Sequence, residues 1–271
     1  MGIIIAVLLF SFIIIFHELG HFLLAKKNGI RVDEFSLGLG PTLLGKQIGE
    51  TKFSLKLLPF GGACMMGEDD ADDLSEGSFN SKSVWARMSV VAAGPIFNLI
   101  LACVFCFILI MITGYRSPEI TGVLDGYSAQ EEGLQAGDVI TEINGRNVHI
   151  WDDVSLYTMT HADEAPFKVE YERDGKKYTA KLEPRQLEGD AAPLLGVTSG
   201  DIVKPGIFKS VEYSIYKVKY WMNYTVDSLR MLVTGQAGLK DLSGPVGIVN
   251  AVDDMYQEAA PAGFGVVMLS M

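Results

Sequence analysis

The sequence predicts a multi-pass α-helical membrane protein that carries a β-hairpin on the cytoplasmic side and an inserted α+β domain on the extracytoplasmic side. Two apolar stretches, residues 3–25 and 88–113, are each long enough to cross a bilayer as a helix. Apolar residues make up 49% of the 271-residue chain and charged residues 20%, which indicates that the charge is gathered in a separate, water-exposed domain. The net charge of −11 gives no support to nucleic-acid binding.

The first predicted helix, residues 1–27, contains two histidines and a glutamate in the sequence HELGH. Residues four apart lie on the same face of a helix, so His17 and His21 can bind one metal ion. Glu18 can reach a water molecule on that metal and act as a general base, the arrangement used by zinc hydrolases. Polar side chains are costly inside an apolar helix, which argues that they have a function. The motif therefore predicts a Zn2+ site with Glu18 as the catalytic residue.

A signal peptide, or an anchor whose polar residues face a neighbouring helix, is the plainer interpretation of the same stretch. Signal peptides begin with basic residues and end at a small-residue cleavage site. Residues 1–5 carry no charge, and the apolar run continues past His21 to Ala25. The sequence therefore favours a membrane helix with a metal site.

The orientation in the membrane follows from the basic residues. Many of them lie in residues 26–87, between the two spans, and none precedes the first span. The positive-inside rule then places residues 26–87 in the cytoplasm, and the N-terminus and the acidic domain outside it. The three cysteines, Cys64, Cys103 and Cys106, all fall outside that domain, so no disulfide framework is predicted.

Residues 28–84 form the predicted cytoplasmic-side hairpin and a linker. Residues 32–41 and 51–62 alternate partly between apolar and polar, and the turn-prone residues 45–49 separate them. An exposed edge of such a hairpin can pair with an extended peptide. A hairpin that only shields the metal site from water fits the sequence equally well.

The second predicted helix, residues 85–114, has a glycine, a proline and an asparagine inside its apolar run. Gly94 and its small neighbours allow another helix to approach closely, and Pro95 leaves one backbone carbonyl without its helical partner. Asn98 brings a side-chain amide to the same region. We predict that Asn98, Gly94 and Pro95 position the substrate, while a hydrogen bond between helices is the simpler role for Asn98.

Residues 115–204 have the pattern of one small α+β domain. A strand at residues 120–124 precedes a short helix, a Gly-Asp turn at Gly137 and a Val/Ile strand that ends in an Asn-Gly turn. Residues 167–178 then give two strands around an Asp-Gly hairpin turn. This order resembles a PDZ domain, a fold that binds peptides by adding them as a strand, so a peptide is a candidate ligand.

The remaining residues form two segments. Residues 205–235 have apolar residues at helical spacing and charged residues elsewhere, which predicts an amphipathic helix. We expect this helix to rest on the outer membrane surface or against the PDZ-like domain. Residues 236–271 are expected to begin a third core transmembrane segment.

The HELGH helix, the glycine-rich hairpin, the GPxxN sequence of the second helix and the single PDZ-like domain together resemble the site-2 protease family. More narrowly, they resemble the bacterial RseP-type regulated intramembrane metalloproteases that carry one PDZ domain. The resemblance covers essentially the whole chain and implies a zinc-dependent intramembrane endopeptidase in the bacterial inner membrane. It implies that His17 and His21 bind Zn2+ and that Glu18 is the general base. The implied substrates are single-span membrane proteins, often anti-sigma factors.

The third zinc ligand of that family is an aspartate of an LDG motif in a later transmembrane helix. The Leu-Asp-Gly sequence of this chain, at residues 124–126, falls in an expected turn of the PDZ-like domain and is interpreted as unrelated. Residues 244–248 and 264–271 resemble the approach to the third core helix, so we expect the chain to stop before the aspartate. Because catalytic zinc normally keeps three protein ligands, the alternative function is a catalytically inactive, membrane-anchored PDZ scaffold.

Overall fold

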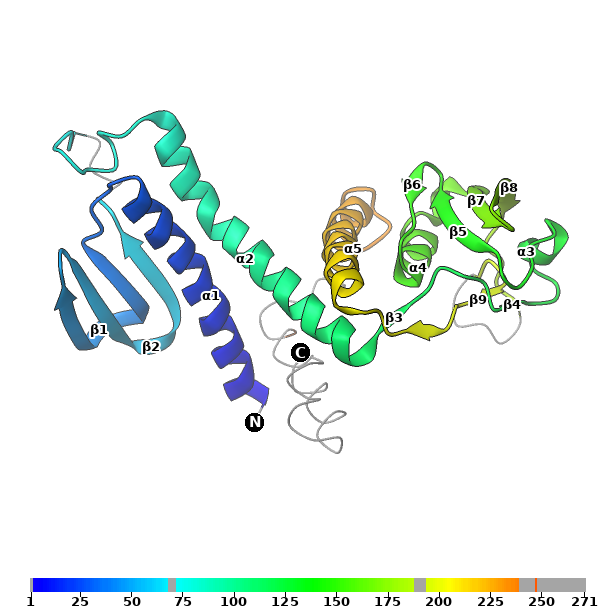
Figure 1. Ribbon diagram of the computed structural model, residues 1–271, viewed down its shortest axis with the longest axis horizontal. Coiled ribbons are helices and arrows are strands. Elements are labelled where there is room, and N and C mark those ends of the chain that lie inside the picture. Colours follow the sequence, from blue (N-terminus) through cyan, green and yellow to red (C-terminus); the bar gives the residue numbers. More distant parts are fainter. Residues whose placement is uncertain (1, 68–71, 188–193, 239–246, 248–271) are drawn as a thin grey trace. The chain divides into compact units, whose positions relative to one another are not determined.

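The computed structural model describes residues 2–67, 72–187, 194–238 and 247 (Figure 1). The chain forms two compact units, of which the first comprises residues 1–102 and 242–271 and the second comprises residues 103–241. The third transmembrane segment expected in residues 236–271 lies almost entirely outside the described residues.

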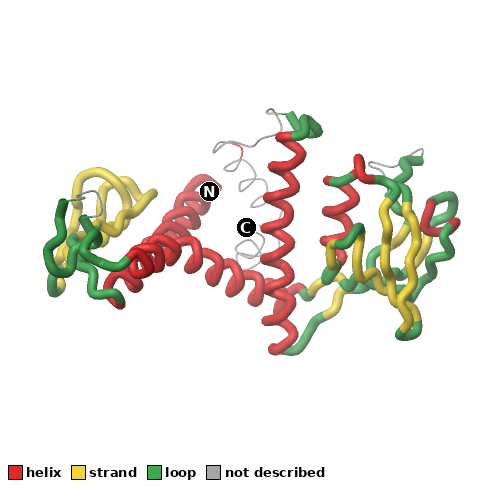
Figure 2. The backbone as a smooth tube through the Cα atoms, turned by 90° about the horizontal axis from the view of Figure 1, so that it is seen from above, coloured by secondary structure: helices red, strands yellow, loops and turns green. Residues whose placement is uncertain are grey.

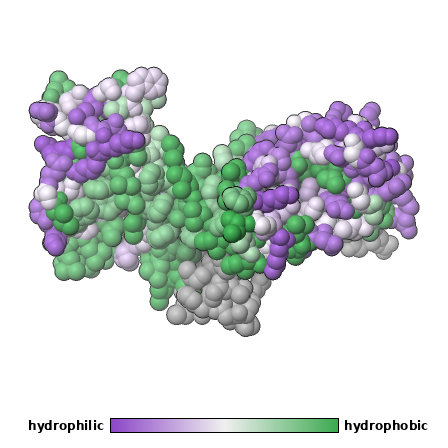
Figure 3. Space-filling model, in the orientation of Figure 1, coloured by the Kyte–Doolittle hydropathy of each residue, from purple (hydrophilic) through white to green (hydrophobic). Residues whose placement is uncertain are grey.

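Two long helices, α1 (Gly2–Lys27) and α2 (Val84–Thr113), have the length and composition of membrane spans. Apolar side chains cover the face of both helices that Figure 3 shows. A Cβ atom added to Gly20 of α1 would meet the carbonyl oxygen of Ala93 at 2.6 Å, so the absence of a side chain allows the two backbones to approach closely. The small residues of α2 therefore have the packing role that the sequence indicates, and Gly20 of α1, which was not predicted, faces them.

The segment between the helices forms a β-hairpin of β1 (Glu34–Ile48) and β2 (Thr51–Met65). Its turn is the Gly49-Glu50 pair, with Gly49 at a φ of +61°, a conformation that favours glycine. The predicted turn-prone stretch, residues 45–49, contains the turn only at Gly49, because Gly45 stays in β1 and pairs with Ser54 of β2. Both strands are also longer than the predicted ones.

The hairpin is held against α1 close to the HELGH motif. Its first residues lie between two parts of β2, so that Phe35 faces both Phe53 and Cys64. Phe22 of α1 packs on the rings of Phe35 and Phe53, at centroid distances of 5.4 and 5.7 Å. The buried residues of this core are Ala25, Ile30, Val32, Phe35, Cys64, Met66 and Val90. This packing fixes the end of β2 beside the polar residues of α1.

The second unit contains a four-stranded antiparallel sheet in the order β6-β5-β7-β8 (Figure 2). Its strands are β5 (Val139–Ile143), β6 (Arg146–Asn147), β7 (Phe167–Arg173) and β8 (Lys176–Leu182). Two short strand pairs accompany it: β3 (Tyr115–Arg116) with β10 (Ile202–Val203), and β4 (Gly122–Val123) with β9 (Val197–Thr198). The helices are α3 (Ser128–Glu131), α4 (Trp151–Thr160) and the short 3-10 helix η1 (Ala162–Glu164).

The turn chemistry of this α+β domain agrees with the sequence. Asn144-Gly145 joins β5 to β6 and Asp174-Gly175 joins β7 to β8, all four residues with positive φ, as two-residue hairpin turns require. The strand predicted at residues 120–124 is shorter, because only Gly122 and Val123 pair with β9. Helix α4, which buries Val154, Leu156 and Tyr157, is absent from the predicted elements.

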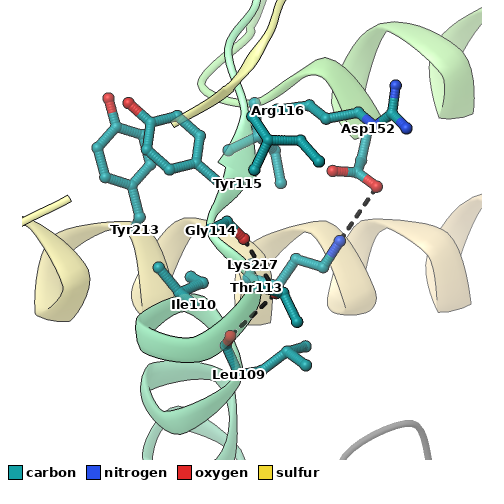
Figure 4. A pocket seen from close by; sticks show the side chains of 11 residues that line it. Leu109, Ile110, Thr113, Gly114, Tyr115, Arg116, Asp152, Tyr213 and Lys217 are labelled. Carbon is teal, nitrogen blue, oxygen red and sulfur yellow. Dashed lines mark hydrogen bonds and ion pairs between the residues drawn. The ribbon is translucent and has the colours of Figure 1, made fainter. Parts of the chain in front are cut away.

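The last described helix, α5 (Ile207–Val233), crosses the end of α2 within the second unit (Figure 4). Ser210 donates a hydrogen bond to Sδ of Met111 (3.1 Å), and Tyr213 stacks on Tyr115, with ring centroids 3.7 Å apart. Lys217 pairs with Asp152 of α4 at 3.1 Å. The tyrosines and this ion pair border a cavity of about 210 Å³ at the end of α2.

The two faces of α5 differ. Toward the α+β domain, Asp227 is only 6% exposed and accepts a hydrogen bond from Nη1 of Arg146 (2.7 Å). Arg230 bonds the carboxylates of Asp163 and Glu164. The other face exposes a row of apolar residues at helical spacing, namely Phe208, Val211, Ile215, Met222, Val226, Leu229 and Val233. The helix is amphipathic, with its ionic side fixed to the domain.

Candidate metal centre

His17 and His21 lie one above the other on α1, in the middle of the first unit. Their ring centroids are 4.8 Å apart and the rings stand edge to face. Both side chains are half-buried between α1 and α2. The helical spacing therefore brings the two imidazoles together as the sequence predicts.

Helix α2 contacts both imidazoles through Nδ1. The Nδ1–H group of His21 donates to the backbone carbonyl of Val90 (2.7 Å). The side-chain amide of Asn98 lies 3.1 Å from Nδ1 of His17, with Nδ2 facing the ring. Because both Nδ1 atoms are engaged by α2, the Nε2 atoms are the ones left to bind a metal ion.

The two Nε2 atoms converge on Gly94. A Cβ atom built on Gly94 would lie 2.5 Å from Nε2 of His17 and 2.5 Å from Nε2 of His21. Any side chain at position 94 would collide with both imidazoles, so glycine allows α2 to pass directly against the two Nε2 atoms. Two neighbouring imidazole nitrogens are a donor set that suits Zn2+, which binds histidine nitrogen at about 2.0–2.1 Å. The donors therefore fit zinc.

The two histidines supply part of a zinc coordination sphere. No group of three His, Cys, Asp or Glu side chains that could hold a metal ion exists in the described part of the chain. Asp125, of the Leu-Asp-Gly sequence, lies in the second unit and accepts a hydrogen bond from Gln130 (2.6 Å) in the turn before α3. The Leu-Asp-Gly sequence thus falls in a turn of the α+β domain, as the sequence predicts.

Glu18 lies against the end of the hairpin. A Cβ atom on Gly62 of β2 would come within 3.2 Å of Cγ of Glu18 and 3.1 Å of the Ser36 carbonyl oxygen. Within the described residues the carboxylate of Glu18 makes no hydrogen bond. The close approach of β2 at Gly62 was not predicted, since no sequence pattern marks it.

The three residues of α2 that were predicted to position a substrate have different surroundings. Gly94 is buried against the histidines, and Pro95 is exposed on the helix. Asn98 contacts His17, and its Oδ1 atom is buried with no hydrogen-bond partner among the described residues. Val90, whose carbonyl holds His21, was missed. It lies four residues before Gly94, which lies four before Asn98, and this helical spacing is the signal that identifies it.

The chain is similar in sequence to proteins of one peptidase family. A family model described as peptidase family M50 matches residues 5–271. A protein of Clostridium acetobutylicum that bears a zinc metalloprotease name is 38% identical over 97% of this chain and 76% of its own length. A similarly named protein of Clostridium perfringens is 35% identical over 100% of this chain and 79% of its own. The regulator of sigma-W protease RasP of Bacillus subtilis is 28% identical over 92% and 79%.

One solved structure, the PDZ domain of an SdrC-like protein from Listeria monocytogenes, is similar to 32% of this chain and covers 87% of its own. The sequence identity is 22% and the TM-score 0.23. A likeness at this level supports no argument, and the description of the α+β domain rests on its own strands and turns.

Proposed function

This chain belongs to peptidase family M50, as a member of the site-2 proteases, and from that premise we propose that it is a zinc-dependent intramembrane endopeptidase. The metal is Zn2+, held by His17 and His21, and Glu18 is the general base. The observation that carries the proposal is the convergence of the two Nε2 atoms on Gly94 between two apolar helices. An apolar helix has no structural need for two adjacent imidazoles, each with its Nε2 against a glycine of the neighbouring helix.

The chemistry proposed for the site is hydrolysis of a peptide bond. Bound zinc supplies Lewis-acid activation of the attacking water and of the substrate carbonyl. Glu18, one position after His17, accepts the proton of that water and returns it to the leaving amine. The apolar surroundings of α1 and α2 limit the access of bulk water to the reacting groups.

The hairpin supports a mode of substrate binding. A helical substrate hides its carbonyls in hydrogen bonds, so it must be extended locally before cleavage. The last residues of β2 pair with the first residues of β1 and pass beside Glu18 at Gly62. We infer that an extended segment of a single-span membrane protein, such as an anti-sigma factor, adds along this edge. A hairpin that only shields the site remains the alternative role.

The second unit is proposed to select among substrates. Its sheet, turns and α4 helix fit the PDZ-like domain that the sequence predicts, and such a domain would bind a peptide or exclude substrates with large outer domains. The proposed location is the bacterial inner membrane, with the N-terminus and the PDZ-like domain outside the cytoplasm. Deletion of residues 118–200 is expected to abolish the preference for trimmed over full-length substrate. An unchanged preference would overturn this role.

A catalytically inactive, membrane-anchored PDZ scaffold is the second candidate function. The observation in its favour is that the described residues contain two histidine donors but no third ligand beside them. The arrangement of the site argues against a scaffold, because each imidazole has its own Nδ1 partner on α2 and Glu18 is present beside them. A scaffold has no use for this arrangement.

The test is cleavage of a tagged single-span substrate by the purified full-length protein, beside Glu18→Gln. We expect cleavage by the unaltered protein, loss of at least about a hundredfold in the variant because the general base is gone, and zinc in both. Protein without zinc and without cleavage would contradict the enzyme and favour the scaffold. Equal cleavage by both proteins would contradict the role of Glu18.

A further inference from the structure

We propose that Asn98 is a positioning residue for the metal site, which holds His17 in the tautomer that binds zinc. In the zinc-loaded protein its side-chain oxygen accepts a hydrogen bond from Nδ1–H of His17. The inference rests on the proposed function and assigns to Asn98 a role different from substrate positioning.

The first support is the environment of the Asn98 side chain. Its amide lies 3.1 Å from Nδ1 of His17, and its second polar atom, Oδ1, is buried with no hydrogen-bond partner among the described residues. A buried carbonyl without a donor is costly, by about 1–3 kcal/mol. Rotation of the amide by half a turn would give this oxygen a donor at Nδ1 of His17 and leave Nδ2 in the position that Oδ1 had.

The second support is the chemistry of a neutral imidazole, which carries one proton. When Nε2 binds a metal ion, the proton must be on Nδ1, and an N–H group there needs an acceptor. The Asn98 side chain lies at hydrogen-bond distance from Nδ1 of His17, and which of the two atoms donates depends on the tautomer of the ring. Rotation of the amide by half a turn replaces Nδ2 with Oδ1 at almost no change in shape. With Oδ1 as the acceptor at Nδ1, Asn98 would favour the His17 tautomer whose Nε2 is free to bind zinc.

The third support is the contrast with His21. The partner of its Nδ1 is the Val90 carbonyl, which is an acceptor in every state and keeps Nε2 unprotonated. Val90, Gly94 and Asn98 are spaced four residues apart, so one face of α2 serves both histidines and the point between them. Of the two Nδ1 partners, only Asn98 can change from donor to acceptor. His21 is prepared for zinc by the backbone, and His17 is prepared by the Asn98 side chain.

The test compares zinc affinity of the purified full-length protein, Asn98→Leu and Asn98→Asp, by competition with a zinc-binding dye. Leucine has a similar size but no acceptor, so we expect zinc binding to weaken about 10- to 100-fold, as for loss of a partner that orients a ligand. Aspartate offers only acceptors, so Asn98→Asp is expected to stay within about threefold of the unaltered protein or to bind more tightly. Zinc should also raise the unfolding temperature of the aspartate variant.

The same pair separates positioning from substrate binding. If Asn98 instead donated a hydrogen bond to a substrate carbonyl, both variants would lose that donor. Cleavage would then fall in both, while their zinc affinity stayed unchanged. Unchanged zinc affinity in Asn98→Leu overturns the inference, and so does an equal loss of affinity in both variants. Failure of the unaltered protein to bind zinc would overturn the proposed function, and the inference with it.

A second measurement needs no variant at position 98. Nitrogen-15 NMR of the ring nitrogens in the zinc-loaded protein, with His17→Gln for assignment, reports which nitrogen carries the proton. The inference requires a protonated Nδ1 and a metal-bound Nε2 on His17. Metal bound to Nδ1 would overturn it, whether or not the Asn98 variants fold.

Discussion

The four histidines of the chain form two pairs in contrasting settings. In the first unit, His17 and His21 present both Nε2 atoms to one point at Gly94 and are held only through Nδ1. In the second unit, His149 stacks on Tyr216 of α5 at 3.9 Å and His161 stacks on Tyr157 of α4 at 4.2 Å. The rings of the second pair serve as flat packing surfaces.

The ring nitrogens of His161 sharpen the contrast. Nδ1 of His161 is bonded to the Thr160 hydroxyl (2.8 Å), and its Nε2 lies 3.8 Å from the Asp227 carboxylate. Every polar edge of that imidazole thus faces a protein group. His161 uses both nitrogens within the fold, whereas His17 and His21 keep Nε2 against Gly94 without a hydrogen bond to the described residues. The comparison predicts that zinc binding depends on His17 and His21 and not on His149 or His161.

The largest effect is expected at Gly94. Alanine favours a helix over glycine by about 1 kcal/mol, but its Cβ would lie 2.5 Å from both Nε2 atoms and force the rings apart. We expect Gly94→Ala to weaken zinc binding at least about a hundredfold, which is about 3 kcal/mol, and to abolish cleavage. Metal content and cleavage of the purified protein measure both.

Ala92→Val is the matched control, because residue 92 is an exposed position two residues away on the same helix. It adds volume outside the site, so zinc content should not change. Zinc binding by Gly94→Ala at the strength of the unaltered protein would contradict the metal position inferred from the two histidines.

The next effect concerns the ion pairs that fix α5 in the second unit. Arg146→Ala leaves the buried Asp227 carboxylate without its partner at 2.7 Å, so we expect the attachment of α5 to weaken by about 2 kcal/mol. Hydrogen exchange of the α5 amides should rise, while zinc content stays constant. Lys168→Ala is the control, because its pair with Glu170 is exposed at the surface and should leave α5 unchanged. A loss of zinc in Arg146→Ala would contradict the separation of the two histidine pairs.

The sequence predicts the parts of the fold that depend on local patterns. The HELGH spacing places His17 and His21 on one face because a helix has that period, and the apolar composition of α1 and α2 predicts their length. The Asn-Gly and Asp-Gly pairs predict the tight turns of the α+β domain because few residues accept positive φ. In each case the cause lies within a few residues.

The features that sequence reasoning missed depend on contacts between distant segments. The acceptor for His21 is a backbone carbonyl, which any residue at position 90 would supply, so Val90 carries no chemical signal of its own. Gly62 meets Glu18 only because β2 packs along α1. The position of the hairpin turn has a local reason, since Gly45 can remain in an extended strand and Gly49 takes the positive φ instead.

The smallest expected effect is the change of folding stability with pH that His149 causes. Burial, followed by the nearby Lys219, lowers the pKa of His149 below its usual value, while Asp153 and Glu212 act in the opposite direction. The unfolded chain therefore binds a proton at His149 more readily than the folded protein. The free energy of unfolding should have its full value above about pH 6.5 and should fall as the pH drops through that value. The decrease should be less than about 1 kcal/mol, because the ring is partly exposed to solvent.

His149→Phe keeps a flat ring against Tyr216 but cannot bind a proton, so it should lose this part of the pH dependence. Burial raises the pKa of the neighbouring Asp153, which makes its contribution change in the opposite direction at lower pH. The difference between the unaltered protein and the variant isolates His149, because Asp153 is present in both. Thermal unfolding of the two proteins at pH 7 and pH 5 measures that difference. Equal pH slopes would show that His149 titrates alike in the folded and unfolded chains, and that its stacking on α5 does not exclude the proton.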